Sequence, residues 1–439
     1  MHARPYLMRV VLMGLLGLVL SWQILTLGLS NNLAETQPER SLFFKSNPNA
    51  LLQLADQQLN GKPEATQAQP AAPPNSAATA SSAIGARTAP TDAIAALARR
   101  ALHNDPMNAR AYRILAQLAE LGGDEARADV LMQAAFQHSK RESYASYWLA
   151  HKAGAQGDFT RAVELIDGLL RVRPQLTRAL APFLLNLVEA HGKLNEIMAL
   201  LDNNPDWRRG FLEQMIFAAS NPRTPLTILL RLKDTALPPL DGNVAQYINY
   251  LVGHTNFEVA YETWLLFLPV EQLSVAGRLF NGKFEVGSAG SQNSPFDWKV
   301  AAGPGVVIDY VQRPGVPGDR ALLLEFQDRR AEFPGVTQTT LLVPGQYKLK
   351  GQMHGAIKTR RGLRWSIRCL TKVNSPPIAM SNLLLGQNKN WERFEFVFTV
   401  PDSNCRAQEV KLSLDARSAS DQFTAGSIMF DDLEIEREK

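Results

Sequence analysis

The sequence has few of the residues on which most catalytic and metal chemistry depends. Its 439 residues include two cysteines and seven histidines, and no two histidines have the spacing of a metal-binding pair. The motifs H-E-x-x-H, G-x-S-x-G, G-x-x-x-x-G-K-[ST] and G-x-G-x-x-G are absent. Two cysteines are too few for an iron–sulfur cluster held by four thiolates. We therefore expect a protein that is not an enzyme.

A strong net charge is lacking too. The chain has 46 basic and 42 acidic side chains, for a net charge of +4, which is too weak to predict nucleic-acid binding. With 45% hydrophobic and 20% charged residues it has the composition of a folded protein. Its length predicts more than one domain.

The N-terminal region contains a long uncharged run. No charged side chain lies between Arg9 and Glu35, a stretch of about 25 residues that is long enough to span a bilayer as a helix. Arg4 and Arg9 precede it and the next basic residue is Arg40, which places the N-terminus in the cytoplasm. We expect residues 7–32 to be a transmembrane anchor in a bacterial inner membrane, with the bulk of the chain periplasmic. The alternative is a cleaved signal peptide, for which the run is long.

Residues 62–91 consist mainly of Ala, Pro, Ser and Thr, which predicts a disordered linker because such a segment buries too little apolar surface. Residues 45–61 before it are expected to form the first helix of a helical region. The segment beginning at Asp92 then supplies the helix that pairs with it. The linker would be looped out between these two helices.

Residues 92–275 have a helical pattern in which residue types recur at a spacing of about 34. Small alanines let paired helices approach, and glycine allows the left-handed turn between them. The aligned pairs are Leu115 with Leu149, Ala116 with Ala150, Gly123 with Gly157, Asp124 with Asp158, Ala128 with Ala162 and Leu131 with Leu165. This pattern resembles the tetratricopeptide repeat (TPR) family. The resemblance implies a solenoid of helical hairpins whose groove binds a protein partner.

The pattern changes to alternation after residue 277. Short segments rich in β-forming residues and bounded by Gly, Pro, Asn and Asp predict an all-β antiparallel sandwich over residues 278–438. The expected strands are Ala321–Phe326, Gly335–Leu342, Tyr347–Met353, Leu363–Leu370, Arg393–Val400, Glu409–Leu414 and Ile428–Glu436.

Four short motifs frame this region. They are Phe280-Asn-Gly-Lys-Phe-Glu285, Pro295-Phe-Asp-Trp298, Trp391-Glu-Arg-Phe-Glu-Phe-Val-Phe398 and Phe430-Asp-Asp-Leu-Glu-Ile435. Their order resembles the galactose-binding-like jelly roll of many carbohydrate-binding modules. The resemblance implies a structural calcium near the first and last strands, with Glu285 and Asp432 as the matching carboxylates. The alternative is a solvated charge at each strand end.

Alternation also selects candidate glycan-binding residues, because side chains two apart lie on one face of a strand. The candidates are Lys348, Lys350, Gln352 and His354 on one strand, and Arg364 and Arg368 on another. If the two strands are neighbours, these residues form a cationic surface that suits uronic, sulfated or pyruvylated sugars. The alternative is a hydrated outer face without a ligand.

Both cysteines, Cys369 and Cys405, fall in the β region. Export to an oxidising compartment favours a disulfide between them. Two buried free thiols are the alternative.

Taken together, we expect a multidomain chain with a transmembrane helix, a TPR-like solenoid and a jelly-roll sandwich. This organisation resembles membrane-anchored accessory proteins of bacterial exopolysaccharide systems. The resemblance implies a scaffold that binds proteins through its helices and polysaccharide through its sandwich, with no required cofactor. The alternative is a pure protein–protein scaffold of the cell envelope that binds no glycan.

Overall fold

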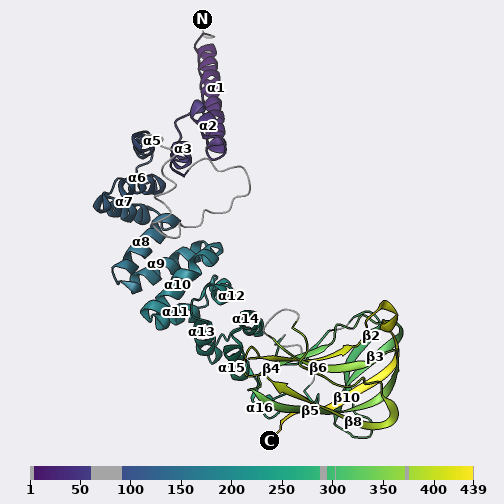
Figure 1. Cartoon of the computed structure of the whole chain (residues 1–439). Coiled ribbons are helices and arrows are strands. Elements are labelled where there is room, and N and C mark those ends of the chain that lie inside the picture. Colours follow the sequence, from purple (N-terminus) through teal and green to yellow (C-terminus); the bar gives the residue numbers. More distant parts are fainter. Residues whose placement is uncertain (1–3, 61–90, 287–293, 302, 371–374, 439) are drawn as a thin grey trace. The chain divides into compact units, whose positions relative to one another are not determined.

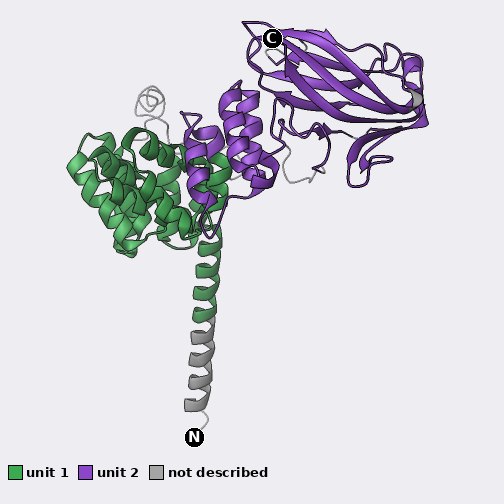
Figure 2. Cartoon of the chain, turned by 90° about the horizontal axis from the view of Figure 1, so that it is seen from below, with its two compact units in different colours: residues 1–214 green, residues 215–439 purple. Residues whose placement is uncertain are grey.

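The computed structural model describes residues 4–60, 91–286, 294–301, 303–370 and 375–438 (Figure 1). The chain divides into two compact units, Met1–Gln214 and Met215–Lys439 (Figure 2). The first unit is helical, and the second combines short helices with a two-sheet antiparallel β-sandwich. The predicted change from a helical N-terminal half to a β-sandwich C-terminal half is confirmed.

The first unit consists of consecutive helices that pack against their neighbours in the chain. They are α1 (Arg4–Leu33), α2 (Pro38–Phe44), α3 (Pro48–Asn60), α5 (Thr91–Asn104), α6 (Ala109–Leu121), α7 (Glu125–His138), α8 (Ser143–Ala155), α9 (Phe159–Val172), the 3-10 turn η2 (Pro174–Leu176), α10 (Thr177–His191), α11 (Leu194–Asp202) and the start of α12 (Arg208–Ala218).

The turns that follow α6 and α8 have the same local structure. Gly123 and Gly157 both adopt positive φ angles, 76° and 80°, which glycine allows without strain. The next residues, Asp124 and Asp158, each cap the following helix by accepting a backbone N–H at 3.1 Å. The sequence spacing of about 34 residues therefore corresponds to a repeated helix–turn–helix geometry.

Helices α3 and α5 flank residues 61–90 and pack against each other. Leu52 and Ala55 of α3 share a buried apolar cluster with Ala98 of α5. The pairing predicted for these two helices is therefore present. The linker predicted at residues 62–91 lies outside the described residues, except for Thr91, which begins α5.

The predicted membrane anchor at residues 7–32, and with it the location as a single-pass inner-membrane protein, is wrong. Over the described part of the chain, no helix combines enough length with enough apolar character to cross a bilayer. The C-terminal end of α1 instead makes polar contacts with the folded region. Ser30 is 1% exposed and its carbonyl accepts the Ser41 hydroxyl at 2.6 Å. The uncharged run thus ends in a helix terminus that packs through hydrogen bonds.

The helices of the second unit that follow α12 are α13 (Thr224–Lys233), α14 (Asp241–Gly253), α15 (Phe257–Phe267) and α16 (Val270–Leu273). Helix α15 packs against the start of the sandwich region through aromatic rings. The ring centroid of Trp264 lies 5.0 Å from that of Phe280 and 5.6 Å from that of Phe296. Because Trp264 is 2% exposed, these contacts bury it and join the helices to the sandwich within one unit.

The sandwich consists of two five-stranded antiparallel sheets. One sheet has the order β1-β4-β9-β6-β7 and the other has the order β2-β3-β10-β5-β8. The strands are β1 (Lys299–Val300), β2 (Val306–Gln312), β3 (Arg320–Arg330), β4 (Val336–Thr340), β5 (Gly345–Lys358), β6 (Leu363–Cys369), β7 (Ala379–Met380), β8 (Gln387–Val400), β9 (Gln408–Leu414) and β10 (Phe423–Arg437), with the 3-10 turn η3 (Ala419–Gln422) before the last.

The core lies between the sheets and follows the alternation of the sequence. Leu322, Leu324, Trp365 and Ile367 are all fully buried, as their strand positions predict. Phe394, Phe396 and Phe398 of β8 alternate along one face of the strand. Phe398 is also buried, whereas Phe394 is only half-buried. The sandwich is therefore less tightly closed beside Phe394.

A disulfide joins Cys369 to Cys405, and the predicted bond is present. It links the end of β6 to the loop before β9, the strand that pairs with β6. Both cysteines are buried, and Gln408 beside them is fully buried and donates to the Cys405 carbonyl at 2.7 Å. The bond fixes the loop against the end of its sheet.

Candidate functional site

The outer face of β5 carries four of the six predicted glycan-binding residues, and all four have partners: the ring centroid of His354 lies 5.3 Å from that of Trp391, and the other three have polar partners. Lys350 bonds Glu434 at 3.1 Å and also bonds Glu436, both on β10. These two hydrogen bonds raise the pKa of Lys350 above its ordinary value. The other two pairings are Lys348 with Glu395 and Glu438, and Gln352 with Asp432 and Arg313. The basic residues of this face are therefore largely neutralised by acidic ones.

The remaining two candidates lie elsewhere. Arg364 and Arg368 belong to β6, which is in the other sheet. Arg364 lies 3.4 Å from Asp415, and Arg368 lies 2.7 Å from Glu409. The six predicted residues therefore form two groups on different sheets and not one cationic surface.

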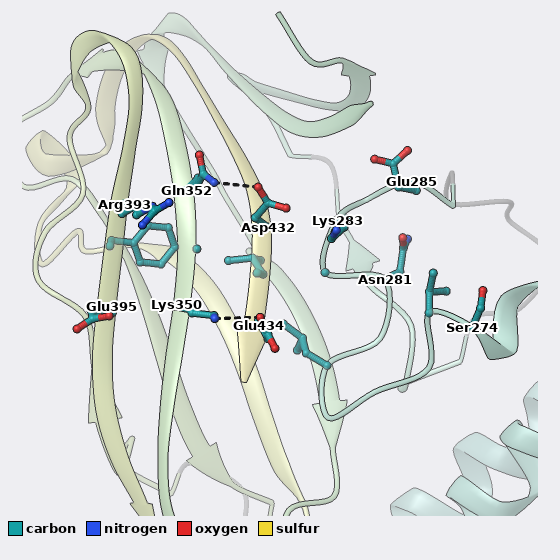
Figure 3. A pocket seen from close by; sticks show the side chains of 16 residues that line it. Ser274, Asn281, Lys283, Glu285, Lys350, Gln352, Arg393, Glu395, Asp432 and Glu434 are labelled. Carbon is teal, nitrogen blue, oxygen red and sulfur yellow. Dashed lines mark hydrogen bonds and ion pairs between the residues drawn. The ribbon is translucent and has the colours of Figure 1, made fainter. Parts of the chain in front are cut away.

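A cleft of 660 Å³ opens beside β5, β8 and β10 (Figure 3). Its second wall is the segment between α16 and the sandwich, which supplies Ser274, Asn281, Lys283 and Glu285. Lys350 and Gln352 are the two sequence-predicted glycan residues that reach it. The volume falls within the range of small-molecule binding sites, about 300–1,000 Å³.

The apolar lining of the cleft depends on a glycine in β5. A Cβ on Gly351 would lie 2.6 Å from the Leu433 side chain and 2.8 Å from the Phe394 ring. Because the glycine has no side chain, Leu433 and Phe394 occupy that space and line the cleft together with Leu279. The cleft thus combines an aromatic and aliphatic patch with polar walls.

The second wall is held in place by hydrogen bonds. The Asn281 side chain bonds both backbone groups of Val286, at 2.6 and 3.1 Å. The Asn281 backbone carbonyl accepts a hydrogen bond from Trp298 Nε1 at 3.0 Å. The Gly282 carbonyl accepts the Leu433 N–H at 2.9 Å, and a Cβ on Gly282 would lie 2.0 Å from the Leu433 carbonyl oxygen. Close contact with β10 at this point therefore requires glycine. The cleft is fixed in position without a ligand.

Charges in the cleft are mixed. Its basic side chains are Lys283, Lys350 and Arg393, and its acidic ones are Glu285, Glu395, Asp432 and Glu434. Arg393 and Lys283 are exposed, and neither forms an ion pair with another described residue. In Figure 3 Arg393 lies beside Gln352. These two cations are available to a ligand, whereas Lys350 already has partners.

An arginine with several partners lies behind this rim. Arg313 directly follows β2 and its side chain is 12% exposed. It bonds Asp431 at 2.5 Å and Asp432 at 3.0 Å, and its Cζ lies 4.3 Å from the ring centroid of Trp391. Asp431 is fully buried, and burial raises its pKa to about 6. The cluster supports the β10 segment that carries Asp432 into the cleft.

The two carboxylates matched to a calcium site have other partners. Glu285 accepts the Arg320 N–H at 3.2 Å, and burial together with the Asp319 carboxylate raises the pKa of Glu285. Asp432 accepts from Arg313 and Gln352. Within the described ranges no three His, Cys, Asp or Glu side chains are grouped so as to hold a metal ion. The residues present therefore do not fit a calcium ion.

Sequence reasoning missed Arg393, Arg313 and the wall at residues 274–285. A signal existed for Arg393, because the alternation of Phe394, Phe396 and Phe398 along one strand places Arg393 on the outer face. No comparable pattern marks Arg313, whose carboxylate partners on β10 lie 118 and 119 residues further along the chain.

No family model and no curated protein matches the chain. Several solved structures align with part of it, and each covers only about the length of the sandwich. A family 4 carbohydrate-binding module is 16% identical, with 36% of this chain and 99% of that chain covered and a TM-score of 0.28. The module TmCBM61 in complex with β-1,4-galactotriose is 17% identical, with 37% and 99% covered and a TM-score of 0.27.

A third similar structure is the CBM22-1 xylan-binding domain of Xyn10C from Paenibacillus barcinonensis. It is 12% identical, with 32% of this chain and 86% of that chain covered and a TM-score of 0.23. The C-terminal sandwich thus resembles carbohydrate-binding modules. Because all three TM-scores are below 0.5, the likeness carries no inference about which ligand this chain binds.

Proposed function

We propose that the sandwich binds a neutral glycan in the cleft between residues 274–285 and strands β5, β8 and β10. The observation that carries this proposal is the composition of the cleft: hydrogen-bonding side chains of both signs around an apolar patch that includes Phe394. Sugars present hydroxyl groups, which both donate and accept, beside C–H faces, which are apolar. A site that combines donors and acceptors with an apolar lining matches both features.

The balance of charge favours a neutral ligand over an acidic one. A polyanion would require an excess of positive charge, yet the cleft is lined by three basic and four acidic side chains, and Lys350 is already bonded to Glu434 and Glu436. The acidic side chains Glu395 and Asp432 also face the same space, and they would repel a carboxylate or sulfate. The acidic sugars expected from the sequence are therefore the weaker candidates.

The second part of the proposal concerns the helices and a protein partner. We propose that the hairpins from α5 to α15 are TPR-like and hold a protein partner. A groove of 420 Å³ between α7, α8 and α9 is lined by polar and apolar side chains, among them Phe136, Lys152 and Arg161. Stacked hairpins commonly use such grooves for peptide segments. The chain would then be a non-catalytic adaptor in the synthesis or export of a polysaccharide.

The test is affinity electrophoresis of the full chain in gels that contain single polysaccharides. The panel holds neutral galactan, xylan and glucan, and acidic alginate and pectate. We expect retardation by a neutral polymer and about tenfold weaker binding for Arg393→Ala, since a hydrogen bond from a charged group contributes about 1.5–3 kcal/mol.

Arg329→Ala is the matched control, because Arg329 is an exposed arginine on β3 of the same sheet that does not line the cleft. It should bind like the unchanged protein. Retardation by acidic polymers alone would contradict a neutral ligand. No retardation by any polymer would instead favour the alternative, a protein–protein scaffold whose sandwich binds no glycan.

A further inference from the structure

Arg313 is surrounded by carboxylates from two parts of the sandwich. Its Nη1 atom lies 2.5 Å from Asp431, 3.0 Å from Asp432 and 3.2 Å from Asp319. Asp319 lies in the turn between β2 and β3, and the other two lie in β10. One guanidinium therefore connects the second strand of the sandwich to the last.

The remaining sides of the guanidinium are covered as well. Its Nη2 atom donates to Gln352 Oε1 at 3.2 Å, and the Trp391 ring lies against its Cζ at 4.3 Å from the centroid. Trp391 and Gln352 come from β8 and β5. Arg313 thus contacts side chains from three strands of one sheet.

Three carboxylates this close repel one another unless a cation lies between them. Asp431 is fully buried, so water cannot compensate its charge. Arginine has a permanent positive charge and five donors in a planar fork, and it can bond several carboxylates at once.

We propose that the Arg313 guanidinium is the built-in cation of this cluster and balances its carboxylates without a metal ion. The sandwich is then independent of divalent cations and dependent on Arg313. This inference goes beyond the proposed function, and it needs no glycan for its test.

The position of Arg313 also explains how the rim of the cleft is ordered. The pairing of β10 with β5 shifts register between Asp431 and Glu434, and Asp432 has a φ of 52°, which is uncommon for a residue other than glycine. Arg313 bonds both Asp432 and Gln352, which bond each other at 2.9 Å and line the cleft. Arg313 is therefore a positioning residue for these two side chains.

The first test is the thermal unfolding of the full chain with calcium, with magnesium and with a chelator. We expect the same midpoint in all three for the unchanged protein. The second test is Arg313→Ala, which removes the cation and leaves its carboxylates in place. We expect a midpoint lower by about 5 °C or more, since a buried charge loses its partner.

Chemical rescue separates a missing cation from a merely missing side chain. Added ethylguanidinium should recover a large part of the loss in Arg313→Ala, whereas an equal concentration of sodium chloride should not. Arg329→Ala is the control, and neither its midpoint nor its response to these cations should differ from the unchanged protein.

Three results would overturn the proposal: a chelator that lowers the midpoint of the unchanged protein, an Arg313→Ala variant with an unchanged midpoint, or a destabilised variant that no cation restores. If Arg313→Ala does not fold, Arg313→Lys keeps the charge and loses the fork. It should fold with an intermediate midpoint that ethylguanidinium does not change, because its own ammonium occupies the site. An Arg313→Lys variant that also fails to fold would contradict the proposal.

Discussion

Removing the disulfide provides a quantitative test of how the sandwich is stabilised. The change is Cys369→Ala together with Cys405→Ala, which deletes the bond without leaving buried thiols. Both positions are nearly buried, at 8% and 5% exposed, and alanine is accommodated in a buried site. The substitution therefore acts mainly on the unfolded chain, which gains conformational freedom when the bond is absent.

The magnitude follows from the length of chain that the bond closes. The two cysteines are 36 residues apart. In the chain-entropy relation, a loop of this length removes about 13 cal/mol/K from the unfolded state, which corresponds to about 4 kcal/mol at 25 °C. Loss of the two sulfur atoms from the core adds about 1 kcal/mol. We therefore expect the free energy of unfolding of the second unit to fall by about 4–5 kcal/mol.

The measurement is urea unfolding of the full chain, followed by tryptophan fluorescence. Unchanged protein with a reducing agent should lose about 4 kcal/mol, slightly less than the double variant because it keeps both sulfur atoms, and the reducing agent should leave the double variant unaffected. A single variant, Cys369→Ala, should lie between the two. A loss below about 1 kcal/mol would refute the reasoning, because it would mean that the bond closes no loop of this length in the unfolded chain.

Two further predictions concern Asp431 and Trp264. The pKa of Asp431 is about 6 in the folded protein, against an ordinary value of 3.8, so the folded protein binds this proton more tightly than the unfolded chain does. The protonated group therefore adds stability below pH 4, and this contribution is lost as the pH rises through 6. Relative to the unchanged protein, Asp431→Asn should gain about 3 kcal/mol of unfolding free energy between pH 4 and pH 7, and an equal pH dependence of the two proteins would contradict this. Trp264→Ala should destabilise the second unit by about 3–5 kcal/mol in urea unfolding, because the ring is buried against Phe280 and Phe296. A loss below about 1 kcal/mol would contradict this and would show that α15 contributes little to the stability of the sandwich.

Local patterns in the sequence predicted much of the fold. A period of two gives the inward face of each strand, and Leu322, Leu324, Trp365 and Ile367 are indeed in the core. The spacing of about 34 residues predicted the repeated turns after α6 and α8. These features depend on residues close together in the chain, so a single sequence contains them.

The membrane anchor shows where local reasoning failed. The absence of charge up to Glu35 predicts a membrane span, but charge is only one property of the run. Ser30 and Asn31 near its end bond Ser41 and Asn47, which follow in the next segments of the folded region. A window that counts charges gives no weight to such polar contacts, because their partners lie outside the window.

The candidate site was predicted in part, and the reason lies in strand order. Alternation placed Lys350 and Gln352 correctly on an outer face, and both line the cleft. Alternation does not predict which strands flank β5, and the cationic surface expected from the sequence required β6, with Arg364 and Arg368, to be its neighbour. The structure places β5 between β10 and β8, whereas β6 lies in the other sheet.

Strand order also determines the chemistry of the face, beyond its position. Beside β6, Lys350 would have belonged to a cationic surface that selects acidic ligands. Beside β10, it meets Glu434 and Glu436, and the face becomes charge-balanced. The same lysine thus favours an acidic or a neutral ligand depending on which strand, distant in the sequence, pairs with β5. For antiparallel sandwiches, the charge of a single strand is therefore a poor guide to the ligand until the register with its neighbours is known.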